Sequence, residues 1–251
     1  MTSVTQRIKQ IKQPRGGYIK PKEFNITVLD DDIELNQTEN IHSSLVGLAV
    51  DYMTRYSGGT NLKEAFRISI MGASLIGEDK FAQKLLKGIK GLDDDSISNA
   101  CKLVGYDVCF RAGIAGYRPV ETINPDKDTI ANIRYMVQRS LKFIDIYGPI
   151  TKDGFTFEGG YTQLVSTGDG DFLTKSTLWD FKVSVKAPTN AHTLQLLMYY
   201  LMGMKSIHKK DFQSIENLGI FNPRLNSVYL FEISKVSSEI IKEVSEKVIG
   251  Y

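Results

Sequence analysis

The period of apolar and polar residues along the chain changes at Pro149. Between about residue 40 and residue 147, apolar residues recur every three or four positions, which is typical of amphipathic helices. This period predicts helices over residues 41–56, 62–76, 80–89, from 93–95 towards 110, and 128–147. Gly148 and Pro149 supply the expected stop for the last of them. The first part of the chain is therefore expected to be mainly helical.

After Pro149 the residues alternate between apolar and polar and are rich in β-formers, which favours short strands. The expected elements are strands over 155–165, 171–174 and 177–185, a helix over 190–204, strands over 216–221 and 227–233, and a helix over 237–249. A further short strand is expected over 24–29. We predict an α/β fold divided into a basic arm with a short strand (1–39), a helical region (40–125) and an α/β core (126–251).

Composition narrows the class of protein. The chain has 251 residues, of which 42% are hydrophobic, so it can bury a full core. Its apolar runs are too short to span a bilayer and its first residues lack a signal peptide, so we expect a cytoplasmic protein without a membrane partner. The two cysteines predict neither a disulfide framework nor a zinc or iron–sulfur site.

Charge points weakly to nucleic acid. The net charge is only +2, but residues 1–22 carry six basic residues and no acidic one. Lys12, Arg15 and Lys20 of this basic arm are candidates to contact a phosphate backbone, and Lys186 in the C-terminal half is another. A partly disordered, solvated terminus is an equally good interpretation of the arm.

The most informative segment is residues 168–203, which hold three polar features inside an apolar context. Asp171 follows a glycine-rich turn, Asp180 and Lys182 lie within one predicted strand, and Gln195 and Tyr199 lie four apart on the next helix. Residues i and i+2 of a strand share a face, so Asp180 and Lys182 project together. Two carboxylates can mount Mg²⁺, which prefers oxygen ligands, and an ammonium group can stabilise a phosphoryl transition state.

An isolated pair such as Asp180 and Lys182 is ordinarily a surface ion pair. Here the strand is flanked by Leu178, Trp179 and Val183, so the two charges face a desolvation cost unless they are paired or bound to a metal. The flanking residues therefore favour a functional interpretation.

The run from Gly168 to Tyr199 resembles the RecB-like branch of the PD-(D/E)XK nuclease superfamily. In that branch a Gly-x-x-Asp strand start is followed by Asp-x-Lys and then by Gln-x-x-x-Tyr on a helix. The resemblance covers about residues 128–235. It implies a restriction-endonuclease-like αβββαβ core, a mixed sheet flanked by helices, and a Mg²⁺- or Mn²⁺-dependent nuclease acting on DNA in preference to RNA. Asp171 and Asp180 would be metal ligands and Lys182 the catalytic lysine, with Gln195 and Tyr199 assisting.

Many members of that superfamily carry one more acidic or histidine ligand before the first strand. The local candidates for it here are Asp145 and Glu158, His42 is a distant third, and a site without a third carboxylate is a further alternative. A rival function is a nucleic-acid-binding or protein-interaction module that has the nuclease fold and regulatory or lost catalysis. A chance motif match is the third interpretation.

Overall fold

The computed structural model describes residues 2–251, which form two compact units. The α/β unit combines residues 2–29 with Ile144–Tyr251, and the helical unit spans Asp30–Phe143. This division differs from the predicted segments 1–39, 40–125 and 126–251. The first 29 residues pack with the C-terminal part of the chain, and the long helix α8 (Lys127–Tyr147) belongs mostly to the helical unit.

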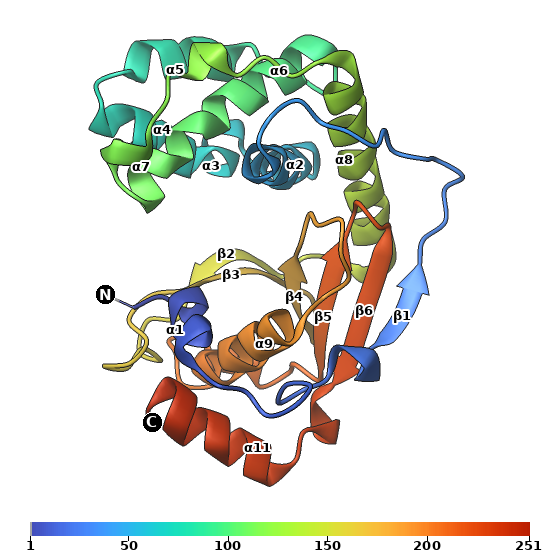
Figure 1. Cartoon of the computed structure of the whole chain (residues 1–251), viewed down its shortest axis with the longest axis vertical. Helices are drawn as coiled ribbons and strands as arrows, with labels where there is room; N and C mark the ends of the chain where they lie inside the picture. The colour runs from blue at the N-terminus through green and yellow to red at the C-terminus, as the bar shows by residue number, and fades with distance from the viewer. Residues whose placement is uncertain (1) are drawn as a thin grey trace. The chain divides into compact units, whose positions relative to one another are not determined.

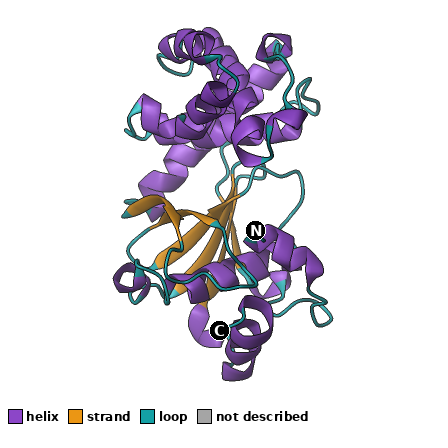
Figure 2. Ribbon diagram, turned by 90° about the vertical axis from the view of Figure 1, so that its left-hand side faces the viewer, coloured by secondary structure: helices purple, strands orange, loops and turns teal. Residues whose placement is uncertain are grey.

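A six-stranded mixed sheet organises the α/β unit, with the strand order β1-β6-β5-β4-β3-β2 (Figure 1). The strands are β1 (Asn25–Val28), β2 (Lys152–Thr156), β3 (Asp169–Leu173), β4 (Thr177–Phe181), β5 (Asn217–Asn222) and β6 (Ser227–Glu232). β4 and β5 are parallel, and every other neighbouring pair is antiparallel. Figure 2 shows the twist of the sheet. The α/β prediction is confirmed at this level.

Helix α9 (Asn190–Gly203) connects the parallel strands β4 and β5, as a parallel pair requires. Its apolar residues are buried in one core cluster with Leu178 of β4, Leu218 of β5 and Phe231 of β6. Each fully buried leucine side chain of this kind contributes about 1.5–3 kcal/mol of transfer free energy. Trp179 faces the other side of the sheet, where its ring lies 5.4 Å from Tyr147.

The basic arm is ordered, so its interpretation as a solvated, partly disordered tail is wrong. Residues Val4–Gln10 form helix α1, and Val4, Ile8, Tyr18 and Ile19 are buried in the core of the α/β unit. The segment is basic because lysines and arginines lie between these apolar residues. Its backbone is held by packing while its cations remain at the surface.

Two predicted strands of the α/β unit end earlier than expected, and the last predicted helix is divided. The strand predicted over 155–165 is only Lys152–Thr156, because Gly159 adopts a positive φ and the chain leaves the sheet. Its later apolar residues, Phe157 and Val165, are buried from a loop. β4 ends at Phe181, and the last helix is divided into α11 (Ser238–Glu243) and a π-helical segment Val244–Ile249.

The helical unit confirms the predicted helices with two interruptions. Its helices are α2 (Ser43–Ser57), α3 (Leu62–Ala65), α4 (Arg67–Leu75), α5 (Asp79–Lys87), α6 (Asp94–Leu103) and α7 (Asp107–Arg111), followed by most of α8. The predicted helix 62–76 is broken at the buried Phe66, and a 3-10 turn separates α6 from α7. Within residues 2–251, no helix is both long and apolar enough to cross a membrane.

Candidate active site at the end of β4

The two predicted carboxylates meet at the end of strand β4. Phe172 of β3 pairs with Trp179 of β4, and extending this antiparallel register by one position sets Asp171 opposite Asp180. Asp171 is partly buried and Asp180 is 1% exposed. The tertiary structure therefore brings together residues nine positions apart in sequence, at the sheet end that α9 approaches.

Asp180 and Lys182 form a partly buried ion pair. The Nζ atom of Lys182 donates to Oδ1 of Asp180 at 2.9 Å, and the lysine side chain is 27% exposed. The other oxygen, Oδ2, is buried and has no hydrogen-bond partner among the described residues. A buried carboxylate oxygen without a partner is costly, so this atom is the strongest sign of an external cationic or donating ligand.

Asp171 also fixes the local backbone. Its Oδ2 atom accepts a hydrogen bond from the backbone N–H of Phe181 at 2.7 Å. Phe181 stands between Asp180 and Lys182 in the sequence. The side chain of Asp171 therefore holds the backbone that carries both of these groups. Phe181 itself points to the opposite face, where its ring lies 6.0 Å from Phe221.

Gln195 and Tyr199 bond to each other on the face of α9. Nε2 of Gln195 donates to the Tyr199 hydroxyl at 2.9 Å, and both side chains are buried. Burial, followed by the nearby charges of Asp180 and Asp171, raises the pKa of Tyr199 far above its usual value. The tyrosine is therefore held neutral beside the carboxylates.

His192 lies one turn before Gln195 on the same helix. Its Nδ1 accepts the backbone N–H of Thr189 at 3.2 Å, which caps the start of α9 and leaves the proton on Nε2. Burial and the charge of Lys182 lower the pKa of His192, and Asp180 opposes them. The imidazole is thus a neutral group near the ion pair.

The sequence analysis missed Asn222, which is 1% exposed at the end of β5. Its Nδ2 donates to the carbonyl oxygen of Ser184 at 2.8 Å, and its Oδ1 accepts the N–H of Arg224 at 3.0 Å. The amide thereby continues the pairing of β4 with β5 two residues past Lys182. Its place in an Asn-Pro-Arg-Leu-Asn stretch indicates turn chemistry, and this concealed the contact with a distant strand.

The remaining candidate ligands are exposed. Glu158 is exposed after β2, where it accepts a 3.4 Å hydrogen bond from Thr156. Asp145 is exposed on α8, and His42 caps α2 through Ser44. Across residues 2–251, no group of three His, Cys, Asp or Glu side chains is arranged to hold a metal ion. The metal-ligand role predicted for Glu158 beside Asp171 and Asp180 stays a prediction.

The predicted phosphate-contacting cations Lys12, Arg15, Lys20 and Lys186 are all exposed. Arm and site come close at the start of α9, because the hydroxyl of Thr193 donates to the carbonyl oxygen of Ile19 at 2.6 Å. A Cβ atom on Gly17 would lie 2.7 Å from that of Asn190, so the glycine permits this approach. The arm's Arg15 and Lys20 are thus carried by a segment docked on the helix that borders the carboxylates.

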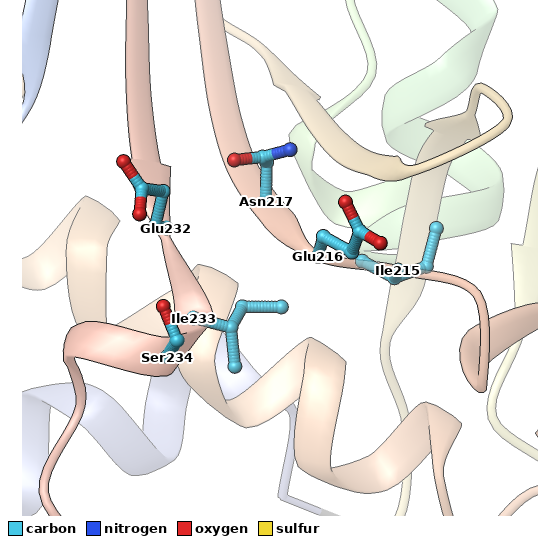
Figure 3. Close-up of a pocket in the computed structure, with 6 residues that line it drawn as sticks. All are labelled: Ile215, Glu216, Asn217, Glu232, Ile233 and Ser234. Carbon is cyan, nitrogen blue, oxygen red and sulfur yellow. The ribbon is translucent and has the colours of Figure 1, made fainter.

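A surface depression lies at the other end of the sheet. It is lined by Ile215, Glu216, Asn217, Glu232, Ile233 and Ser234, as Figure 3 shows. Asn217 pairs with Thr177 at the start of β4, so the depression is separated from Asp180 by the length of that strand. Its two glutamates are exposed, and they take no part in the candidate active site.

Comparison of the chain with protein-family models, with curated proteins and with solved structures gave no match.

Proposed function

We propose that this protein is a metal-dependent nuclease that hydrolyses phosphodiester bonds, with DNA preferred over RNA. The observation that carries the proposal is the buried Oδ2 atom of Asp180, which lacks a partner beside a second carboxylate and a lysine. An ordinary structural ion pair satisfies its own atoms. This arrangement leaves an acceptor directed at a ligand that the chain itself does not supply.

The fold supports the same proposal. The element order α8, β2, β3, β4, α9, β5, with the short helix α10 (Lys209–Phe212) before β5, is compatible with the αβββαβ order expected of a restriction-endonuclease-like core. Asp171 lies on β3, the Asp180–Lys182 pair lies at the end of β4, and the Gln195–Tyr199 pair lies on α9. The order of elements and the motif residues therefore both support the proposal.

The residues at this location fit Mg²⁺ or Mn²⁺. Asp171 and Asp180 offer carboxylate oxygens and no sulfur or imidazole ligand, which suits a hard cation. Mg²⁺ is commonly held by one or two carboxylates and completes its shell with water, so the absence of a third acidic group among the described residues does not conflict with the fit. When bound, the cation supplies neutralisation of phosphate charge and a lowered pKa of water.

The side chains around the site have separate roles. Lys182, held 2.9 Å from Asp180, places a positive charge where charge develops on the phosphoryl oxygens. The neutral Tyr199 and Gln195 form a fixed polar wall on the α9 side. His192 keeps a proton on Nε2, which is suited to donate a hydrogen bond to a phosphate oxygen. Asn222 and the Asp171–Phe181 contact hold the backbone on both sides of Lys182.

Cleavage of labelled single- and double-stranded DNA and RNA with Mg²⁺ or Mn²⁺ tests the proposal. Lys182→Ala and Asp180→Asn should abolish turnover. Lys152→Ala is the matched control, because Lys152 is 28% exposed and pairs with Asp211 at 3.1 Å but lies at the start of β2. Activity that survives Lys182→Ala, or a wild type inactive on every substrate, would favour a nucleic-acid-binding or protein-interaction module on this fold.

Metal binding gives an independent measurement. Calorimetric titration of Mn²⁺ should show binding to the wild type and strongly weakened binding to Asp180→Asn, since the buried acceptor is then uncharged. Equal affinities for the two proteins would refute the ligand role of Asp180.

A further inference from the structure

Helix α5 (Asp79–Lys87) of the helical unit has two sharply different faces. Ala82, Leu85 and Leu86 are buried against the unit. Lys80, Lys84 and Lys87 are exposed, and at 100° per residue they fall within an arc of about 60° on the opposite side. The three lysines therefore form one continuous stripe, here termed the α5 lysine stripe.

No acidic side chain of the described residues forms an ion pair with the α5 lysine stripe. The two acidic residues at the start of the helix are engaged elsewhere: Glu78 accepts hydrogen bonds from Tyr106 and Tyr117, and Asp79 accepts one from Ser74. Helix α11 and the segment after it differ, since Lys242 lies 4.0 Å from Glu246 and Lys247 lies 3.4 Å from Glu243. Lysines are neutralised locally there and left unneutralised on α5.

The helix dipole explains only part of the stripe. Lys84 and Lys87 lie in the last turn, where a cation is favourable. Lys80 lies in the first turn, where a cation is unfavourable, and Lys80 and Lys84 are like charges four residues apart, an arrangement that destabilises a helix. The stripe therefore weakens the isolated helix, and an external anion would relieve the repulsion.

We propose that the α5 lysine stripe binds the phosphate backbone of a nucleic acid. Lys80 and Lys87 are separated by about 10.5 Å along the helix axis at 1.5 Å per residue. This length corresponds to about three phosphates of one strand at 3.4 Å rise. The inference rests on the proposed function and gives the helical unit a role in it, as a part of the protein that binds the substrate.

Binding without cleavage is the decisive measurement. Fluorescence anisotropy with a fluorescein-labelled DNA duplex in EDTA, at several salt concentrations, gives both the affinity and its salt dependence. The 251-residue variant Lys80→Gln/Lys84→Gln/Lys87→Gln should bind more than tenfold more weakly at low salt. Its slope of log affinity against log salt should be shallower by about 2.7, or about 0.9 per phosphate contact.

Two variants keep the result specific. Lys235→Gln/Lys242→Gln/Lys247→Gln removes the same charge from lysines that are paired with glutamates, and it should leave the slope nearly unchanged. Lys80→Arg/Lys84→Arg/Lys87→Arg keeps the charge and should bind like the wild type, which separates charge from folding. Equal losses in the two glutamine variants, an unchanged slope in the α5 variant, or a wild type that binds no nucleic acid would overturn the inference.

Failure of the nuclease proposal has a different signature. If the wild type cleaves nothing but the α5 glutamine variant alone loses affinity, the stripe is a binding surface of a non-catalytic module. If cleavage depends on Lys182 while the α5 variant binds normally, the nuclease proposal stands and the stripe has another partner, such as an acidic protein.

Discussion

Replacement of Lys182 by methionine tests how strongly the charge of Lys182 stabilises the buried carboxylate of Asp180 at the end of β4. Methionine keeps an apolar stem of similar length and removes the charge 2.9 Å from Asp180. Asp180 is 1% exposed, and its Oδ2 atom already lacks a partner. The substitution therefore leaves a buried carboxylate with neither oxygen paired to a cation.

The size of the effect follows from burial. Breaking a buried ion pair by removing one partner costs about 3–5 kcal/mol. Because the lysine side chain is 27% exposed, water screens part of the interaction, and we expect a loss of about 2–3 kcal/mol in the free energy of unfolding. Lys152→Met breaks a more exposed pair with Asp211 and should cost less than about 1 kcal/mol.

Guanidinium unfolding in EDTA, followed by the fluorescence of Trp179, is the appropriate assay. Trp179 is the only tryptophan, is buried, and adjoins Asp180 in β4, so its signal reports on the α/β unit. The double variant Asp180→Asn/Lys182→Met should recover most of the lost stability, because both charges are then absent. This cycle predicts a coupling energy of about 2 kcal/mol.

Mn²⁺ separates the structural part of the effect from the metal-binding part. At a concentration of 100 times its Kd, a ligand specific for the folded state adds about 2.7 kcal/mol of stability. Mn²⁺ should therefore restore Lys182→Met to near the stability of the metal-free wild type. The reasoning is refuted if Lys182→Met unfolds at the wild-type midpoint in EDTA, or if it and Lys152→Met lose equal stability.

Three further predictions concern other parts of the chain. Burial raises the pKa of Asp107 above its usual value of 3.8. The protonated carboxyl therefore favours the folded state at low pH, and this contribution is lost as the pH rises through the raised pKa. The unfolding free energy of the wild type minus that of Asp107→Asn should fall over that pH range, and a constant difference would contradict the prediction. Gly219→Ala places a Cβ atom 2.3 Å from Trp179 and should destabilise by about 1–3 kcal/mol, measured by the same fluorescence assay; an unchanged midpoint would show that the ring can move. Deletion of residues 2–22 removes buried Val4 and Ile8 and should unfold the α/β unit. Glutamine at the exposed cations Lys12, Arg15 and Lys20 should leave the thermal unfolding of this unit unchanged and only flatten the salt dependence of DNA binding. Equal stability of the two variants would be inconsistent with the docked arm.

Local sequence determined most elements of the fold. The helical period before Pro149 and the alternation after it gave the class, the strands β3 to β6 and helix α9 to within a few residues. The spacing of Asp180 and Lys182 also sufficed to place both groups on one face of a strand. These features depend on residues close together in the chain, which is why a pattern can reveal them.

The failures have a common origin in distant contacts. Val4 and Ile8 are the two apolar residues of α1, and they form a helix because α9 and the C-terminal segment supply a surface to bury them. Phe157 and Val165 alternate like strand residues, yet they fill the same core from a loop. The alternation of apolar and polar residues indicates which side chains are buried. A side chain can be buried from a loop, without the sheet pairing that defines a strand.

The candidate site shows the same division. Sequence alone named Asp171, Asp180 and Lys182, because charges in an apolar strand require a partner. Only the tertiary structure decided that β3 sets Asp171 opposite Asp180 and that Asn222 extends the pairing of β4. Strand register is fixed by packing across the sheet between residues that are far apart in the chain. No local pattern in the sequence contains that information.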